Sequence, residues 1–360
     1  MEHSQSMSNI LAHYIAPAFF VENGTVIQAN STAQALMVTA GTEIFPLITA
    51  GEEEYRAFTH GCLSVTLLLM EEPYSADITA EEGAHLFVCQ SNGENSPLQA
   101  YALAARELRA PLAEMMMLTK RLFRDLPENS DDAACQQAAA VNQSMHQMLR
   151  LVSNMSDAGR FVSGTDVRRE YANITQVLQE MLEQIQSTCD EGGIDFQYSC
   201  PENAIYGPID RDKLERGVYN LISNAIKFGG KEAGVEVTVK ASPKRLYITV
   251  KDNGSGIPQG IRQTLYQRYR RMPGLEDASQ GIGLGIVVAK GAAAMHGGAL
   301  LMEILPDAGT KITMSISLET KDMPLRSPVM RIDYTGHHAH CLVELADSLP
   351  AQLYAPKLLN

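Results

Sequence analysis

Two asparagines and a lysine on one predicted helix are spaced to bind a metal ion and phosphate. Asn220 and Asn224 lie four residues apart in a segment predicted to be helical over residues 211–228, so their side-chain amides point the same way. Magnesium bound with a nucleotide takes oxygen ligands and keeps several waters, and an amide oxygen can complete such a site. Lys227 lies on the adjoining face and offers charge to phosphate oxygens. The block predicts a magnesium–phosphate site, although asparagine pairs are common on amphipathic helices.

A second block places a carboxylate and two glycines at the end of a predicted strand over residues 245–251. The run VKDNGSGIP contains Asp252, Gly254, Gly256 and Ile257. The carboxylate can accept a hydrogen bond from the exocyclic amine of a base, and the glycines let the backbone approach a ligand without a Cβ in the way. The same DNG triplet is a strong hairpin signal, so a plain surface turn is the alternative.

A third block, GIGLGIVVAK, opens a predicted helix that runs toward Met295 and contains Gly281, Gly283, Leu284 and Gly285. Glycines before a helix N-terminus leave free N–H groups and a positive dipole end for phosphate. A dinucleotide-binding Rossmann turn has a similar glycine run. That alternative is disfavoured, because the run lies late in its domain and lacks the acidic residue about 20 positions on that binds ribose.

Taken in order, NLISNAIKF, DNGSGIP and GIGLGIVVAK resemble the N, G1 and G2 boxes of the histidine-kinase catalytic domain in the GHKL ATPase superfamily. Tyr266 resembles one of the aromatic pair that precedes the ATP lid, and Gly309-Thr310 resembles the small final box. The resemblance implies an α/β sandwich that binds ATP with Mg²⁺. It places Asn220 and Asn224 on magnesium and phosphates, and Asp252 on the adenine amino group.

The same resemblance defines the full set of candidate site residues. Lys227 is expected to contact phosphate, Phe228 to lie against the base, and the glycines to permit lid movement. The residues expected to bind ATP are Asn220, Asn224, Lys227, Phe228, Asp252, Gly254, Gly256, Ile257, Tyr266, Gly281, Gly283, Leu284, Gly285 and Thr310, with Asn224 as the magnesium ligand. Gyrase-type relatives carry a hydrolytic glutamate where Asn220 stands, so a kinase-type site is favoured over a non-signalling GHKL ATPase.

The segment around Arg106 resembles the phosphoacceptor box of histidine kinases, whose usual form is His-Glu-Leu-Arg-Thr-Pro-Leu. Here it reads Arg-Glu-Leu-Arg-Ala-Pro-Leu, with Arg106 at the acceptor position and Glu107 as the adjacent acid. A guanidinium has no free lone pair to attack phosphorus. Ala110 stands where the family uses Thr or Asn in phosphatase activity, and it cannot orient a water. His146 on the following helix is the alternative acceptor.

Two long amphipathic segments are predicted as helices around this box. Apolar residues recur at three- and four-residue steps from Leu98 to Leu126 and from Ala134 to Met155, which is a heptad-like pattern. A hairpin of this kind cannot bury its apolar stripe alone, so we expect a homodimer through residues 97–160, as a four-helix bundle. The alternative is a hairpin that packs on its own neighbours.

The first ninety residues have short apolar runs separated by turns. Ala18–Val21 and Thr25–Ile27 predict a hairpin around Asn23-Gly24, and Ser64–Met70 and His85–Cys89 predict further strands. The run FFVENGTVIQANSTAQAL resembles the opening of a PAS domain. An unrelated small α+β domain is the alternative.

The bulk composition limits the partners and the compartment. A net charge of −13 argues against nucleic acid or an anionic membrane as a main partner. No run approaches the roughly 20 apolar residues that cross a bilayer, and the N-terminus lacks a signal-peptide pattern. We therefore expect a cytoplasmic protein with its six cysteines reduced.

The chain is thus expected to be a multidomain α+β protein. We predict a PAS-like domain over residues 1–96, a dimerisation hairpin over 97–162, an ATP-binding domain over 163–320 and an extension over 321–360. In the extension, His337, His338, His340 and Cys341 lack the spaced ligand pairs of zinc sites. Alternation over 329–334 and 341–345 predicts a strand hairpin there instead. The expected function is ATP-dependent two-component signalling without self-phosphorylation. A response regulator or a partner kinase is the expected partner, and phosphorylation of a histidine on a partner chain is the alternative.

Overall fold

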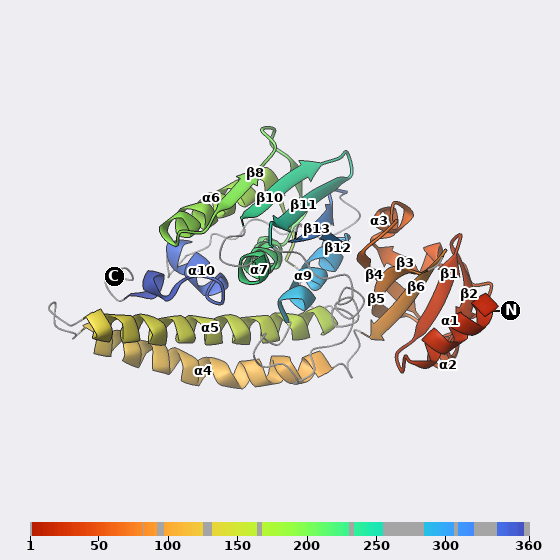
Figure 1. The fold of residues 1–360 in the computed structure, drawn as a ribbon, viewed down its shortest axis with the longest axis horizontal. Helices are drawn as coiled ribbons and strands as arrows, with labels where there is room; N and C mark the ends of the chain where they lie inside the picture. The colour runs from red at the N-terminus through yellow and green to blue at the C-terminus, as the bar shows by residue number, and fades with distance from the viewer. Residues whose placement is uncertain are drawn as a thin grey trace.

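The chain folds into two β-sheet regions and a long helical hairpin (Figure 1). The computed structural model describes residues 2–81, 83–91, 97–124, 132–163, 168–229, 234–254, 284–305, 309–319 and 337–355. Within those ranges no helix is long and apolar enough to cross a membrane.

Residues 2–91 form a unit of antiparallel strands with short helices. Its elements are α1 (Glu2–Ala12), β1 (Ala18–Glu22), β2 (Thr25–Ala29), α2 (Ser31–Ala35), η1 (Phe45–Leu47), β3 (Ile48–Ala50), α3 (Glu52–Arg56), β4 (Cys62–Leu69), β5 (Glu72–Glu81) and β6 (Ala84–Ser91). The predicted β1–β2 hairpin is confirmed. Its turn residues Asn23 and Gly24 have φ of 50° and 79°, as a type I′ turn requires. The PAS resemblance of this unit stays a prediction.

Two antiparallel helices follow, α4 (Pro97–Arg124) and α5 (Asp132–Ser163), as the heptad-like spacing predicted. The apolar stripe is divided between two environments. Ala105, Leu112, Val152 and Met155 are buried in the hairpin, whereas other members of the stripe face solvent. The exposed large apolar residues are Leu103, Leu108, Met115, Met117 and Leu118 on α4, with Val141, Met148 and Leu151 on α5. A four-helix bundle with a second chain stays a prediction.

Residues 168–319 build a layered α/β sandwich. Its strands are β7 (Glu170–Asn173), β8 (Phe196–Ser199), β9 (Tyr206–Ile209), β10 (Val235–Ala241), β11 (Arg245–Asp252), β12 (Leu300–Leu305) and β13 (Gly309–Ser317), and its helices are α6 (Ile174–Glu191), α7 (Arg211–Gly229) and α9 (Leu284–Met295). Alternate residues of β10, β11 and β13 point into a core against α6, α7 and α9. In Figure 1, α7 and α9 lie between this sheet and α5.

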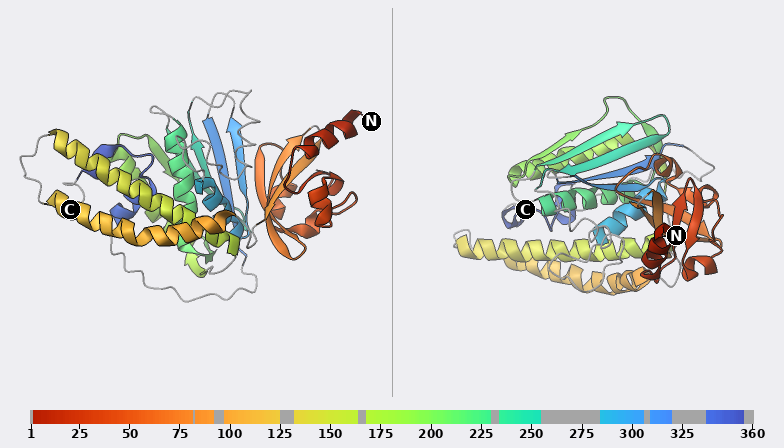
Figure 2. Two further views of the ribbon diagram at one scale, coloured as in Figure 1. Left: turned by 90° about the horizontal axis from the view of Figure 1, so that it is seen from below. Right: turned by 45° about the vertical axis from the view of Figure 1, so that its right-hand side comes forward.

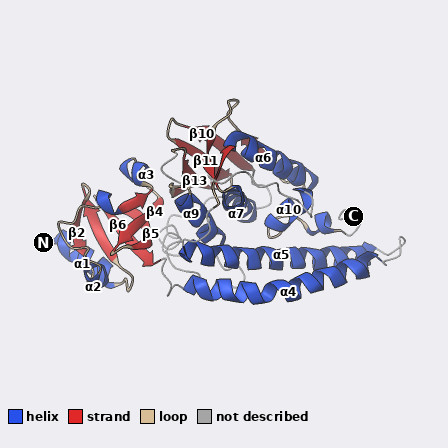
Figure 3. Cartoon of the chain, turned by 180° about the vertical axis from the view of Figure 1, so that it is seen from behind, coloured by secondary structure: helices blue, strands red, loops and turns tan. Residues whose placement is uncertain are grey.

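The two sheet regions join edge to edge where β4 pairs with β12. The paired residues of these two strands lie 236 to 240 positions apart in the sequence. Leu300 lies opposite Ser64, and Met302 lies opposite Cys62, in antiparallel register. The result is one sheet of order β2-β1-β6-β5-β4-β12-β13-β11-β10-β8, with β3 paired to β4. Figure 3 shows the two groups of strands from behind. Gly61 has φ of 93°, and a Cβ there would lie 2.6 Å from the Met302 carbonyl oxygen, so only glycine suits this crossing.

The C-terminal extension is helical where a strand over residues 341–345 was predicted, so that prediction is wrong. Residues 337–344 form the helix α10 (His337–Glu344), and η2 (Ala351–Tyr354) follows a turn. Cys341, Leu345 and Leu349 are buried at four-residue steps, and that spacing suits a helix and its continuation better than a strand. In Figures 1 and 2 this segment lies between α5 and the α6–α7 layer. The predicted strand over 329–334 lies outside the described residues.

Candidate nucleotide-binding site

Helix α7 is the element around which the nucleotide motifs gather. Asp210 caps its first turn, because the Asp210 carboxylate accepts a hydrogen bond from the Lys213 backbone N–H at 3.2 Å. One face of the helix packs into the sandwich core, with Leu214, Val218 and Leu221 fully buried or nearly so. The other face carries Asn220 and Asn224 at the predicted one-turn spacing.

The glycine of the third block lies directly against Asn220. A Cβ on Gly285 would lie 2.8 Å from the Asn220 Oδ1 atom. A second close approach supports this one, because a Cβ on Gly217 of α7 would lie 2.8 Å from the Ala292 Cβ of α9. The two glycines therefore let α7 and α9 pack closely and bring the N-terminus of α9 to the asparagine.

Asp252 ends β11 with its carboxylate already oriented by the backbone. Its Oδ1 atom accepts from the Gly254 N–H at 3.1 Å, and its Oδ2 atom accepts from the Thr310 N–H at 2.9 Å. Burial raises the pKa of the Asp252 carboxyl, and the backbone hydrogen bonds from Gly254 and Thr310 oppose that shift. Gly309 packs so closely on Asp252 that a Cβ there would lie 2.2 Å from its carbonyl oxygen. The carboxylate is thus fixed in one direction, as the recognition of a base amine requires.

The second block also touches α7. A Cβ on Gly254 would lie 2.7 Å from the carbonyl oxygen of Gly229, the last residue of that helix. The three sequence motifs, which are about 30 residues apart in sequence, therefore converge along α7.

Asn220 already has side-chain partners, and they come from the helical hairpin. Its Oδ1 atom accepts from Arg150 Nη2 at 3.1 Å and from Asn154 Nδ2 at 3.0 Å. Its Nδ2 atom donates to the Arg216 carbonyl oxygen at 2.9 Å. Asn220 is completely buried. Sequence reasoning missed both α5 residues.

The two α5 residues belong to a polar stripe along that helix. Its members step by four and three residues, the spacing of one helix face; they are Gln143, Gln147, Arg150, Asn154 and Asp157. Asp157 pairs with Lys213 at 2.5 Å and also with Arg216. The spacing of these polar residues is visible in the sequence. The prediction for this helix used only its apolar residues, and it therefore did not include the polar face.

The remaining candidate residues lie in different places. Lys227 and Phe228 are exposed at the end of α7, with the Lys227 ammonium 5.5 Å from the Phe228 ring centre. Leu284 is buried among Ala105, Leu112 and Val152 of the hairpin. The predicted site residues Gly256, Ile257, Tyr266, Gly281 and Gly283 lie outside the described residues.

The acceptor position lies on the surface of α4. Arg106, Glu107 and Ala110 are all exposed. The alternative acceptor, His146, is buried, with its Nδ1–H donating to the Asn142 carbonyl at 2.7 Å and its ring edge-on to Tyr354. This packing disfavours attack by His146 on a nucleotide.

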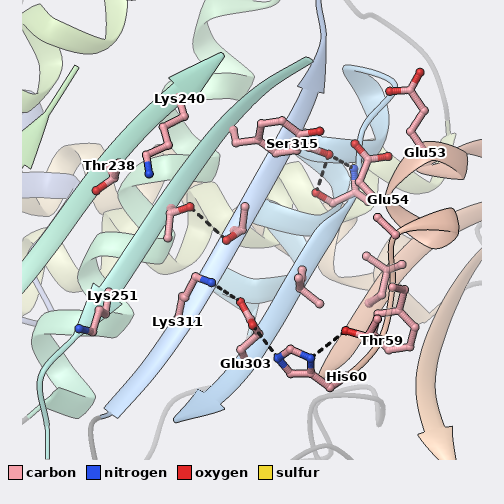
Figure 4. Close-up of a pocket in the computed structure, with 18 of the residues that line it drawn as sticks. Glu53, Glu54, Thr59, His60, Thr238, Lys240, Lys251, Glu303, Lys311 and Ser315 are labelled. Carbon is pink, nitrogen blue, oxygen red and sulfur yellow. Dashed lines mark hydrogen bonds and ion pairs between the residues drawn. The ribbon is translucent and has the colours of Figure 1, made fainter. Parts of the chain in front are cut away.

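A separate cavity lies on the opposite face of the sheet. Its volume is about 610 Å³, and it lies between the outer face of the sheet and residues 53–60 of the N-terminal unit. Figure 4 shows its floor, where Glu303 bridges Lys311 at 2.6 Å and His60 at 2.9 Å. The sandwich core separates this cavity from the residues expected to bind ATP. No group of three or more potential metal ligands occurs in the described part of the chain.

Comparison with known proteins defines the class of the sandwich. Residues 209–320 match the family model described as histidine kinase-, DNA gyrase B- and HSP90-like ATPase. The matched range includes α7, β10 to β13 and α9, and therefore all three motifs.

The relatives include a histidine kinase and a sensor protein. Hybrid signal transduction histidine kinase D of Dictyostelium discoideum is 29% identical over 227 residues, 61% of this chain and 15% of the relative. Sensor protein KdpD of Escherichia coli (strain K12) is 27% identical over 257 residues, 71% of this chain and 28% of the relative. The chain thus spans less than a third of these relatives. Among solved structures, full-length ShkA in complex with AMPPNP matches with a TM-score of 0.48 and 22% identity, over 64% of this chain and 48% of that chain. The ATPase-family match and the sensor-kinase relatives support the histidine-kinase family.

Proposed function

We propose that this chain is an ATP-binding signalling protein of the histidine-kinase family that does not phosphorylate itself. The observation that carries the proposal is the convergence of Asn220, Asp252 and Gly285 along α7. In this proposal Asp252 accepts the adenine amino group, and Asn220 with Asn224 holds Mg²⁺ and phosphate oxygens. Lys227 and the N-terminus of α9 add positive charge next to the phosphates.

The absence of self-phosphorylation follows from the chemistry of the acceptor position. Arg106 stands there, and its protonated guanidinium has no lone pair for in-line attack on the γ-phosphorus. Ala110 offers no hydrogen bond that could orient a water for the reverse reaction. ATP therefore acts as a ligand that changes the arrangement of the helices, and a protein partner detects that change.

The proposed partners follow from the surface of the hairpin. The exposed apolar residues of α4 and α5 make a face that a second copy would cover in a four-helix bundle. We place the sensor function in residues 1–96, dimerisation in 97–162 and ATP binding in 163–320, with a response regulator or a related kinase as partner. Residues 321–360 belong to none of these three parts.

One labelling experiment tests the proposal. Purified full chain is incubated with γ-labelled ATP, alone and with related kinases that retain the acceptor histidine but have a disabled ATP site. We expect saturable Mg–ATP binding, weakened by Asn224→Ala, and no label on this chain. Label on the partner would convert the proposal to kinase activity in trans, and label on this chain would contradict the argument from Arg106.

A further inference from the structure

The described C-terminal residues 337–355 lie between the hairpin and the ATPase-like region and bond to both. Toward α5, the side chain of Gln143 donates to the Leu349 carbonyl oxygen at 2.7 Å, and that of Asn142 donates to the Tyr354 carbonyl oxygen at 3.0 Å. Toward α7, the hydroxyl groups of Ser223 and Ser348 lie 3.1 Å apart. The segment therefore connects α5 to α7.

Two acids of this segment hold the cations that surround Asn220. Asp347 pairs with Arg150 at 2.6 Å, and Glu344 pairs with Arg216 at 3.0 Å. Arg150 is 4% exposed and Glu344 is 1% exposed, whereas the Asp347 side chain is 37% exposed. The Arg150 guanidinium is therefore buried although its partner reaches solvent, and a buried cation without its anion is costly. The acids of the C-terminal segment thus stabilise the arginine that donates to Asn220.

The bond from Arg150 competes with the proposed use of Asn220. A side-chain amide oxygen that accepts from Arg150 and Asn154 has both lone-pair directions occupied. The same atom cannot coordinate magnesium at the same time. The Arg150 guanidinium, whose Nη2 atom lies 3.1 Å from the Asn220 Oδ1 atom, would also repel a divalent cation bound there.

Two unsatisfied polar atoms limit the stability of the contact that α5 makes with α7 and residues 337–355. Among the described residues, the Arg150 Nε atom and the Glu344 Oε2 atom are buried and have no hydrogen-bond partner. Each unsatisfied buried polar atom reduces the stability of the contact, by about 1–3 kcal/mol in general. A contact of this kind holds α5 in place without making its release prohibitive.

We infer that residues 337–355 are an internal latch that holds α5 on α7 and blocks magnesium at Asn220. Release of the latch frees Asn220, and Mg–nucleotide then binds. Because linkage is reciprocal, Mg–nucleotide also weakens the latch and loosens α5. This inference rests on the proposed ATP function and adds its regulation, through Arg150, Asp347 and Glu344.

Affinity measurements on the full chain test the latch. The probe is adenylyl imidodiphosphate with Mg²⁺, titrated by calorimetry into wild type, Arg150→Met and Asp347→Asn. Removal of the latch raises the fraction of the chain in which Asn220 is free to bind. A larger fraction of this kind lowers the apparent Kd for Mg–nucleotide. We expect Arg150→Met and Asp347→Asn to bind about tenfold more tightly than wild type. The matched controls, Arg121→Met on the exposed face of α4 and Asp190→Asn on the exposed face of α6, should keep the wild-type affinity.

The outcomes separate the latch from the ATP function. Adenosine without metal reports on Asp252 and should bind all variants equally. Equal Mg–nucleotide affinity in wild type and Arg150→Met would overturn the latch and leave the ATP function standing. Weaker binding by Arg150→Met would also overturn it and assign Arg150 to phosphate binding instead. Failure of wild type and every variant to bind any nucleotide would overturn both.

A measurement on wild type alone avoids dependence on the folding of a variant. Hydrogen exchange is followed with and without Mg²⁺ and adenylyl imidodiphosphate. We expect faster exchange in residues 143–157 and 337–355 when nucleotide is bound, because α5 and the latch then separate from α7. Unchanged or slower exchange in both segments, under saturating nucleotide, would contradict the inference.

Discussion

Lys290 of α9 and Asp77 of β5 form a buried ion pair that joins the ATPase-like region to the N-terminal unit. The Lys290 Nζ atom lies 2.8 Å and 2.9 Å from the two carboxylate oxygens. The Lys290 and Asp77 side chains are 13% and 5% exposed. The Ser64 hydroxyl of β4 donates to the same carboxylate. The helix that presents Gly285 to Asn220 is therefore held directly by a strand of the proposed sensor.

We expect Lys290→Met to destabilise the protein strongly. The substitution leaves Asp77 buried without its cation, and removal of one partner of a buried pair costs about 3–5 kcal/mol. Urea denaturation followed by tyrosine fluorescence measures the change in the free energy of unfolding. The exposed pair Lys244–Glu319 provides the control, since Lys244→Met should change stability by about 0–1 kcal/mol. Equal effects of the two substitutions would show that the buried pair contributes little.

Asp252→Asn should weaken nucleotide binding while the protein stays folded. A hydrogen bond to a charged group contributes about 1.5–3 kcal/mol, which corresponds to a loss of affinity of about 10- to 100-fold. Calorimetry with adenosine isolates this contact from the phosphates. Glu236→Gln, which removes an exposed charge from the neighbouring strand β10, is the control. Adenosine affinity unchanged in Asp252→Asn would remove Asp252 from the adenine site.

Arg106→His should introduce an acceptor for phosphate. A neutral imidazole has the lone pair that a guanidinium lacks, and Arg106 is exposed on α4. After incubation with γ-labelled ATP, we expect an acid-labile phosphoryl group on Arg106→His and none on wild type. A His146→Gln substitution in the same background should leave the label in place. Loss of the label in that double variant would transfer the acceptor role to His146.

The folding stability of the protein should depend on pH through His146. Burial lowers the pKa of the His146 imidazole, and the charge of Lys120 on α4 lowers it further, while the bond to the Asn142 carbonyl acts in the opposite direction. The unfolded state, with a pKa of about 6.5, therefore binds a proton that the folded state resists. Folding stability is present above that pH and falls as the pH decreases through it.

His146→Phe tests that dependence, because it keeps a ring against Tyr354 and removes the titration. We expect the loss of stability between pH 7 and pH 5 to be smaller in His146→Phe than in wild type. Urea denaturation at a series of pH values gives the comparison. A His146→Phe profile parallel to that of wild type would exclude this contribution.

Most individual elements were predictable because their signals are local. The hairpin β1–β2, the helices α4, α5 and α7, and the strands β10 and β11 all lie where spacing and turn residues placed them. The order of the three nucleotide motifs was equally visible, since each motif is a short run with its own chemistry. The predicted strand over residues 341–345 was wrong, because a short apolar run fits a strand and a buried helix almost equally well.

The sequence by itself determined the residue types of the site, including the asparagine pair, the aspartate, the glycines and the arginine in place of a histidine. Tertiary structure alone decided three relationships: β4 pairs with β12, Lys290 meets Asp77, and Arg150 reaches Asn220. Each one joins residues at least 70 positions apart. Local propensity carries no information on such pairs, because they form only when whole packed surfaces meet. The motifs therefore indicate what the chain can bind, and the packing of α5 and residues 337–355 determines whether Asn220 is open to it.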